Sequence, residues 1–369
     1  MQESHKGFLD YFQDLPDPRI DRKKPHRVDE ILLLTLTAVI CGAEGWQDIE
    51  LFGQQKLGYL RKFLPYANGA PSDDTLRRLF RRINLQEFQK RFTVWAENLK
   101  TEVQRLISID GKVSRHSFDG DKSPLYTVSA FASEARLVLA QTKVNDKSNE
   151  ITSIPELLDL LDISGAIVTI DAMGCQREIA GQIIESKADY VLSLKGNQGT
   201  LHKDIKLVFS DGELLKELYA SSAETIDGGH GRIETRKCKV LKIPEALAKI
   251  HQWPGLKTII EIDSIRELKD HCTREKRYYI SSLESDAAAL APIIRSHWSI
   301  ENSLHWILDV SFNDDASRIR KGNGPQNIGI IKHTALNMLQ QNRQKRESIK
   351  GLRKAAGWND ERLTQIIQQ

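Results

Sequence analysis

The sequence predicts a mixed α/β protein in which a helical N-terminal part precedes a mixed five-stranded sheet. Two observations indicate this fold class. Residues 1 to about 100 carry apolar side chains at helical spacing, whereas short apolar or alternating runs after residue 105 predict strands. Helical segments separate the later strands, which is typical of parallel strands joined by crossover helices.

The N-terminal part contains four predicted helices. The first follows Pro25 and includes the apolar run ILLLTLTAVIC (31–41), which is too short to span a bilayer, so we expect a buried helix. A second helix is predicted from Asp48 to Phe63. Ser72 is a favourable N-cap for a third helix, and the fourth runs from Leu85 to Lys100.

Five strands are predicted between residues 106 and 195. They are LISID (106–110), LYTVSAFAS (125–133), RLVLAQTKV (136–144), AIVTIDA (166–172) and YVLSLK (190–195). Only Glu134 and Ala135 separate the second strand from the third, so we expect an antiparallel hairpin there. Helices before and after the fourth strand predict parallel pairing for the later strands.

A strand-rich block from about residue 206 to 285 interrupts the alternation of strands and helices. A long helix is predicted from Asp286 to Val310, followed by a helical and basic tail. We therefore expect three parts: an N-terminal helical domain (1–100), an α/β domain (101–340) that carries the block as an insertion, and a C-terminal tail (341–369).

The composition is that of a soluble globular protein, with 40% hydrophobic and 28% charged residues. The net charge of +3 permits nucleic-acid binding but does not argue for it. None of the four cysteines has the spacing of a zinc-binding pair, which favours reduced thiols. Because the N-terminus lacks the pattern of a signal peptide, we expect a cytoplasmic protein that associates with the nucleoid when it binds DNA.

Two aspartates end predicted strands of the sheet. Asp110 closes LISID, and Asp171 follows four apolar residues in AIVTID. A carboxylate in such a position is costly to bury unless it is paired or binds a metal. A capping role for each aspartate stays open, but two of them on neighbouring strands favour a shared chemical site.

A third candidate carboxylate, Glu301, lies in HWSIENSLHWILDV (297–310). On a helix, His297, Glu301 and His305 share one face, which is compatible with a zinc site or with an exposed polar stripe. Phosphoryl transfer explains all three carboxylates better, since two magnesium ions about 3.5–4 Å apart need oxygen ligands from several elements.

Several segments, taken together and in this order, resemble the DDE transposases of bacterial insertion sequences, and more closely the H-repeat-associated group. The segments are GAEGWQDIE (42–50), SIDGKVSRHS (108–117), KSNEITSIPELL (147–158), TIDAMGCQREIA (169–180), LSLKGNQG (192–199), HGRIETR (230–236), RYYISS (277–282) and HWSIENSLHWILDV (297–310). The resemblance extends from about residue 10 to residue 365.

The resemblance implies a ribonuclease-H-like core with Asp110, Asp171 and Glu301 as the catalytic and metal-binding residues. It implies an enzyme that cleaves transposon ends and joins the 3′-hydroxyl to target DNA with two Mg²⁺ ions, or with Mn²⁺ as a substitute. We expect DNA as partner and a homodimer on DNA. A nuclease of the same fold that only hydrolyses, and a decayed H-repeat remnant that only binds DNA, remain alternatives.

Basic and polar residues near these carboxylates are candidates for DNA contacts. Broader relatives place tyrosine, arginine and lysine around the helix glutamate, where this chain has Ile294, His297 and Leu308. The basic role is therefore expected at Arg295, His297 or His305. The other candidates, each of which also has a purely structural explanation, are Lys112, Arg115, Lys195, Asn197, His230, Arg232 and Arg236.

Two further side-chain groups have two explanations each. The arginines at 77, 78, 81 and 82 form one helix face, either solvated or in contact with the DNA backbone. Trp298 and Trp306 could stack on a displaced base, but core packing is the favoured interpretation.

Overall fold

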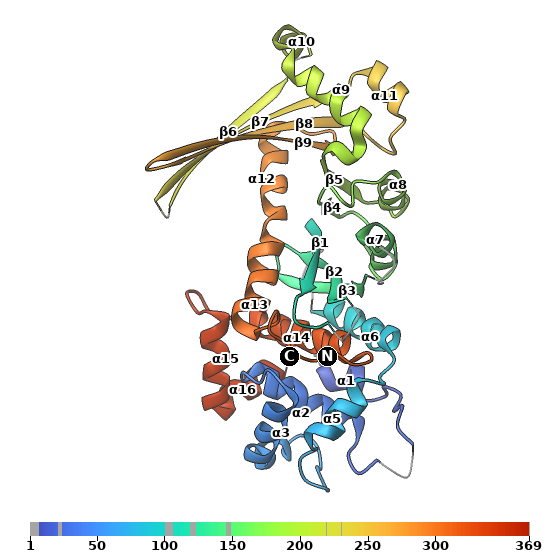
Figure 1. Cartoon of the computed structure of the whole chain (residues 1–369), viewed down its shortest axis with the longest axis vertical. Helices are drawn as coiled ribbons and strands as arrows, with labels where there is room; N and C mark the ends of the chain where they lie inside the picture. Colours follow the sequence, from blue (N-terminus) through green and yellow to red (C-terminus); the bar gives the residue numbers. More distant parts are fainter. Residues whose placement is uncertain are drawn as a thin grey trace, which may run out of the picture. The chain divides into compact units, whose positions relative to one another are not determined.

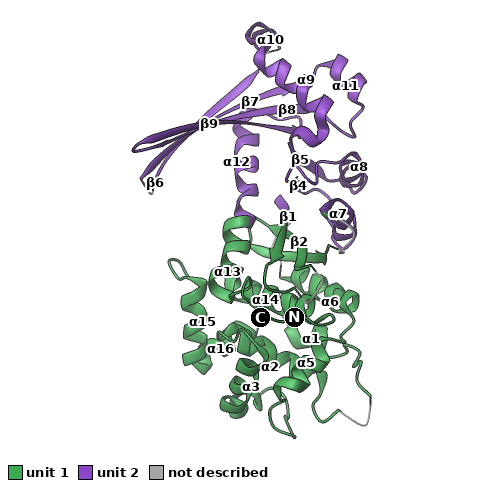
Figure 2. Ribbon diagram, in the orientation of Figure 1, with its two compact units in different colours: residues 1–102, 111–149, 301–369 green, residues 103–110, 150–300 purple. Residues whose placement is uncertain are grey.

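The computed structural model describes residues 7–20, 24–99, 106–118, 123–144, 149–218, 220–229 and 231–368. The chain divides into two compact units (Figure 2). Unit 1 comprises residues 1–102, 111–149 and 301–369, and unit 2 comprises residues 103–110 and 150–300. Both chain ends therefore belong to unit 1.

The predicted N-terminal helices are present in unit 1, with altered bounds for the second and fourth. The helices are α1 (Phe8–Phe12), α2 (Val28–Ile40), α3 (Trp46–Gln55), α4 (Leu57–Leu60), α5 (Asp73–Phe80) and α6 (Leu85–Asn98). The prediction of one helix from Asp48 to Phe63 is wrong, because α3 ends at Gln55 and a separate short helix follows. Lys100, the predicted end of the fourth helix, lies outside the described residues.

Helix α2 confirms the prediction that the apolar run forms a buried helix. Every residue from Val28 to Ile40 is buried. The hydroxyls of Thr35 and Thr37 donate to the carbonyls of Ile31 and Leu33 within the helix, so burial leaves neither hydroxyl unsatisfied. None of the helices in the described ranges is long and apolar enough to cross a membrane.

The C-terminal part of unit 1 is helical, as predicted, and it packs against these helices. Its helices are α13 (Trp306–Phe312), α14 (Gly324–Gln341), α15 (Ile349–Trp358) and α16 (Asp360–Ile367). Arg353 is buried, donates to the carbonyl of Val39 in α2, and places its guanidinium over the ring of Phe312. Burial lowers the pKa of Arg353 to about 10. The arginine thus acts in packing.

The sheet has nine strands rather than the five predicted. The strands are β1 (Leu106–Ser114), β2 (Leu125–Ala132), β3 (Leu137–Lys143), β4 (Ile167–Ile170), β5 (Asp189–Leu194), β6 (Ser221–Gly229), β7 (Arg232–Lys242), β8 (Thr258–Leu268) and β9 (His271–Ser281), in the order β3-β2-β1-β4-β5-β9-β8-β7-β6. The five expected strands are present, and the pairing of β9 with β5 adds the strands of the insertion to the same sheet.

The predicted pairing directions are confirmed. Strands β2 and β3 form the expected antiparallel hairpin in unit 1. In unit 2, β4 pairs in parallel with both β1 and β5. The helices of unit 2 are α7 (Glu150–Leu158), α8 (Arg177–Glu185), α9 (Gly199–Ser210), α10 (Gly212–Glu217), α11 (Glu245–His251) and α12 (Ala287–His297).

Helix α12 packs on the insertion strands of unit 2 (Figure 1). A buried cluster joins Ala287, Leu290 and Ile294 of the helix to Val240 and Ile260 of the sheet. The helix ends at His297, and Glu301–His305 form a π-helical turn before α13 begins. The helix predicted from about Asp286 to Val310 is therefore present but not continuous: it is interrupted at Trp298, and the π turn that follows includes the predicted glutamate.

Candidate catalytic site

Asp110 and Asp171 occupy neighbouring positions on two parallel strands of unit 2. The register pairs Ile109 of β1 with Ile170 of β4, and each aspartate is the next residue of the chain after this pair. The prediction that Asp110 ends its strand is wrong, because β1 continues to Ser114. The parallel pairing with β4 nevertheless stops at Ile109, so both carboxylates follow the last paired residues.

Local hydrogen bonds hold Asp171 in the turn after β4. Its Oδ1 accepts from the backbone amides of Met173 at 3.0 Å and Gly174 at 3.3 Å. The side-chain amide of Asn197 donates to the carbonyl of Ala172 at 2.6 Å, which ties the turn after β5 to the turn after β4. Asn197, a predicted DNA contact, thus holds the backbone of the residue that directly follows Asp171.

Gly174 allows helix α7 to approach this turn closely. A Cβ at Gly174 would lie 2.3 Å from Ile170 Cγ2 and 2.7 Å from Ile154 Cδ1. Both distances are far below normal van der Waals contact, so only glycine fits here without movement of its neighbours. The face of α7 that carries Ile154 therefore rests on the Asp171 turn.

Glu150 is an acidic residue near the two aspartates that the sequence analysis did not single out. It begins α7, is 8% exposed, and its pKa is raised to about 7. Burial is the main cause of the shift, and the negative charges of Asp171 and Asp110 add to it. Glu150 belongs to KSNEITSIPELL (147–158), one of the segments that resemble the transposases, but the resemblance alone assigns no role to this glutamate.

Glu301 and His305 form an ion pair inside the π-helical turn of unit 1. His305 Nδ1 lies 3.0 Å from Glu301 Oε2, so the predicted i, i+4 contact is present. The hydrogen bond from His305 is the main cause of a lowered pKa for Glu301, and the charges of His305 and Lys112 act in the same direction against burial. Glu301 is therefore held in its ionised form. Such π turns occur frequently at functional sites.

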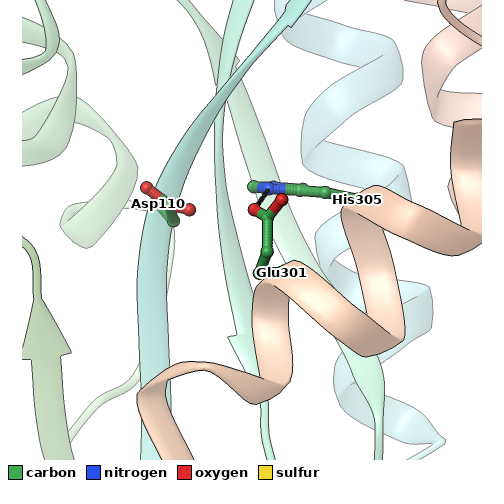
Figure 3. Close-up of side chains that lie close together, drawn as sticks. All are labelled: Asp110, Glu301 and His305. Carbon is green, nitrogen blue, oxygen red and sulfur yellow. Dashed lines mark hydrogen bonds and ion pairs between the residues drawn. The ribbon is translucent and has the colours of Figure 1, made fainter. Parts of the chain in front are cut away.

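One group of side chains has the composition of a metal site. Asp110, Glu301 and His305 each offer a ligand atom, and these atoms lie within 4.8 Å of one another (Figure 3). Neither Asp171, which was predicted as the third carboxylate ligand, nor His297 is in this group. Nδ1 of His297 lies 2.9 Å from the hydroxyl oxygen of Thr169. The zinc interpretation, which needed His297 with Glu301 and His305, thereby loses its support.

Lys112 lies in a network of buried and half-buried carboxylates in unit 1. Its Nζ is 2.6 Å from Asp309, 3.3 Å from Asp315 and 4.0 Å from Asp314, and its side chain is 12% exposed. Burial acts to lower the pKa of Lys112, but the hydrogen bond that Lys112 donates to Asp309 and the charges of the surrounding carboxylates raise it overall. The ammonium predicted to contact DNA therefore already has protein partners.

Asp314 connects Lys112 to a second buried cation. Lys332 Nζ lies 2.7 Å from Asp314 Oδ1, and the Ser114 hydroxyl donates to Oδ2 at 2.9 Å. Burial acts to raise the pKa of Asp314, but Lys332 outweighs it and lowers the pKa to about 2. Lys332 and Asp314 thus form a salt bridge in the interior of unit 1.

Other predicted DNA contacts lie at the surface. Arg115 is 78% exposed on its side chain and lies 3.5 Å from Asp315. Lys195 is exposed at the end of β5. His230 lies outside the described residues.

Three predicted arginines gather where α12 packs on the insertion in unit 2. Arg236 of β7 and Arg295 of α12 share Asp227, at 2.7 Å and 3.0 Å. Arg232 pairs with Glu234 at 3.1 Å, and Arg236 also contacts Glu234. The pKa of Arg236 is lowered, first by burial and then by the charge of Arg295. The cluster is therefore crowded with positive charge.

Both tryptophans around the candidate glutamate are exposed, so the favoured prediction of core packing is wrong. Trp298 is 50% exposed and Trp306 is 58% exposed. In unit 2, the guanidinium of Arg277 lies over the Trp298 ring, 5.2 Å from its centroid. The prediction assumed a continuous helix. Because the helix is interrupted after His297, the two tryptophans lie on other faces than that helix would have given them.

Two family models match the chain. The model described as transposase DDE domain covers residues 101–338, and the model described as DDE_Tnp_1-associated covers residues 9–96. The first spans more than half of the chain and includes Asp110, Asp171 and Glu301.

Relatives agree with these matches. The putative transposase YncI of Escherichia coli O157:H7 is 42% identical over 371 residues, which cover 99% of this chain and 95% of that protein. The H repeat-associated putative transposase YhhI of Escherichia coli K12 is 40% identical over 342 residues, 90% of each chain. The inactive transposase YbfQ of the same strain is 43% identical over 74 residues, 20% of this chain and 88% of that protein. The chain belongs to the DDE transposase family, in its H-repeat-associated group.

Proposed function

Transposases act on DNA, and we propose that this one cleaves the ends of a mobile element and joins the freed 3′-hydroxyl to target DNA. The observation that carries the proposal is the register of β1 and β4, which gives Asp110 and Asp171 neighbouring positions. The grouping of Asp110 with Glu301 supports the same assignment. A carboxylate set of this kind is typical of two-metal phosphoryl transfer on a ribonuclease-H-like sheet.

The donor set fits magnesium, with Mn²⁺ as a substitute. Asp110, Asp171 and Glu301 offer oxygen atoms, which hard divalent cations prefer. The raised pKa of Glu150 beside Asp171 and Asp110 indicates an excess of negative charge, which a divalent cation would relieve. When bound, two such ions would activate the attacking oxygen and stabilise the leaving oxygen of the phosphodiester.

Neighbouring groups orient these carboxylates and favour the ionised form of Glu301. The backbone amides after β4 orient the Asp171 carboxylate, while His305 keeps Glu301 ionised and oriented. Hydrogen bonds of this type around metal ligands restrict their rotamers and raise metal affinity. Lys112 and its carboxylates hold β1 to the loop after α13, which keeps the C-terminal flank of Glu301 in place.

DNA would contact the basic residues of the insertion. Arg232, Arg236 and Arg295 form the arginine cluster, and guanidinium groups bind phosphate through paired hydrogen bonds. Arg115, Lys195 and Asn197 are further candidates. We also propose the division into an N-terminal helical domain (1–100), a catalytic domain with insertion (101–340) and a C-terminal part (341–369), and a homodimer that holds two transposon ends.

End cleavage tests this proposal directly. The substrate is labelled DNA that carries the sequences flanking the coding region, with Mg²⁺ or Mn²⁺ in the reaction. We expect wild type to release 3′-hydroxyl ends and to join them to a target plasmid, and Asp171→Ala to lose both products while it still binds DNA. The exposed Glu185→Ala on α8 serves as the matched control with wild-type activity.

The products separate the alternatives. Cleavage without joining identifies a hydrolysing nuclease, and DNA binding without cleavage identifies a remnant that has lost activity. The name of the inactive relative YbfQ makes the second outcome worth testing. Equal cleavage by wild type and Asp171→Ala contradicts the assignment of the carboxylates.

A further inference from the structure

Glu150 has the features of a ligand and not of a surface acid. It is 8% exposed, and no described lysine, arginine or histidine forms an ion pair with it. An isolated buried carboxylate is costly, and proteins retain such groups where a partner or a metal compensates the charge. No protein cation in the described part of the chain supplies that compensation.

The fold directs Glu150 toward the Asp171 turn. Glu150 and Ile154 are four residues apart on α7, so their side chains lie on the same helix face. Ile154 sits so close to Gly174 that a Cβ there would be 2.7 Å away. The backbone amide of Gly174 also donates a hydrogen bond to Asp171. The face of α7 that bears Glu150 therefore packs against the turn that orients Asp171.

Asp171 has one carboxylate oxygen left for a shared cation. Its Oδ1 accepts both amide hydrogen bonds of the turn, and within the described residues Oδ2 has no hydrogen bond or ion pair. The negative charges of Asp171 and Asp110 both reach Glu150, which places three carboxylates of unit 2 in one electrostatic group. A divalent ion is the partner that three carboxylates can share.

We propose that Glu150 is a fourth carboxylate ligand of the divalent-metal site, contributed by the first turn of α7 beside Asp171. The inference rests on the proposed function, because it assumes that Asp110, Asp171 and Glu301 hold the metal. It adds an oxygen ligand to the side of the site formed by β1 and β4. We therefore expect substitution of Glu150 to lower the affinity for the metal ion and to leave the fold intact.

Metal binding without DNA tests the inference independently of catalysis. The probe is Mn²⁺ alone, titrated into the full-length protein and followed by electron paramagnetic resonance of the free ion. We expect Glu150→Gln to raise the dissociation constant roughly tenfold or more, on the scale of changes made around metal ligands. Glu150→Asp should retain part of the affinity, and the exposed Glu156→Gln on the same helix should bind as wild type does.

Thermal unfolding distinguishes a loss of metal binding from a folding defect. Glu150→Gln should unfold at or above the wild-type temperature without metal, because it removes a buried charge, and it should show a smaller stabilisation by Mn²⁺. A lower melting temperature without metal together with an undiminished Mn²⁺ shift would indicate a structural role and overturn the inference.

The two hypotheses fail in different ways. Mn²⁺ binding that depends on Asp171, shown with Asp171→Asn, but is unchanged in Glu150→Gln contradicts the role of Glu150 alone. Binding that is absent in wild type, or unaffected by Asp171→Asn, overturns the proposed metal site and the role of Glu150 with it.

Discussion

Near the candidate site, the acidic residues of the two units differ in how their charge is compensated. In unit 1, Glu301 pairs with His305, Asp309 and Asp315 pair with Lys112, and Asp314 pairs with Lys332. In unit 2, Glu150 is buried near Asp171 and Asp110, and its pKa is raised to about 7. Near the candidate site, unit 1 thus pairs its carboxylates with its own cationic side chains, whereas Glu150 of unit 2 has no ion pair with a described cation and is suited to an added one.

The largest expected effect comes from removing charge on the unit 2 side. Asp110→Asn should reduce end cleavage at least about 1000-fold, equivalent to roughly 4 kcal/mol of transition-state stabilisation. A gel assay of cleaved ends measures this, and a filter-binding assay should show that DNA affinity is retained. Loss of DNA binding in parallel with cleavage would mean that Asp110 supports the fold and not the chemistry.

Removing a cation from unit 1 should instead reduce stability. Lys332 is 3% exposed, so Lys332→Met leaves the Asp314 charge buried and should lower the free energy of unfolding by about 3–5 kcal/mol. Urea denaturation measures the change. Adding Asp314→Leu to Lys332→Met should restore part of the loss. The exposed Lys249→Met on α11 is the control and should cost less than about 1 kcal/mol.

The buried histidine of α14 should make unit 1 sensitive to acid. Burial lowers the pKa of His333 from 6.5 to about 3. Between these values the unfolded chain binds a proton that the folded chain does not, so stability present above pH 6.5 falls as the pH drops toward 3. His333→Gln should flatten the decline of melting temperature over this range, whereas the exposed His271→Gln should not. An unchanged slope in His333→Gln would contradict the assignment.

The arginine cluster should give the smallest effect. Arg236→Gln and Arg295→Gln should each reduce the slope of log affinity against log salt by about 1, because each removes one phosphate contact. Fluorescence anisotropy with labelled end DNA measures the slopes, and Lys249→Gln is a matched surface control. Slopes identical to wild type in both variants would remove the cluster from the DNA interface.

Local patterns sufficed for much of the sheet and for the placement of Asp110 and Asp171 on neighbouring strands. AIVTID is a short, β-branched apolar run, which favours a buried strand with the aspartate at its end, and the structure has β4 there. The hairpin of β2 and β3 followed from alternation and a short turn. Strand β6 was missed because SSAETIDGG has few apolar residues, is mostly exposed, and forms a strand only by pairing with β7.

The missing parts of the site depend on contacts between distant residues. Glu150 resembles an ordinary acidic residue in the first turn of a helix, where the helix dipole favours negative charge. Only the seating of Ile154 against Gly174 reveals its environment. The π turn at Glu301–His305 keeps the i, i+4 contact that a regular helix predicts, so the pattern could not show the interruption or the exposure of Trp298 and Trp306.

Metal-dependent rescue is the most direct test of the claim that Asp171 holds a catalytic cation. Asp171→Cys replaces an oxygen ligand with a thiolate, which Mg²⁺ disfavours and softer divalent ions tolerate better. The account predicts that this variant loses end cleavage in Mg²⁺ and regains part of it in Mn²⁺, so that its Mn²⁺ to Mg²⁺ rate ratio exceeds that of wild type at least about tenfold. Substantial cleavage by Asp171→Cys in Mg²⁺, with a rate ratio equal to that of wild type, would contradict it.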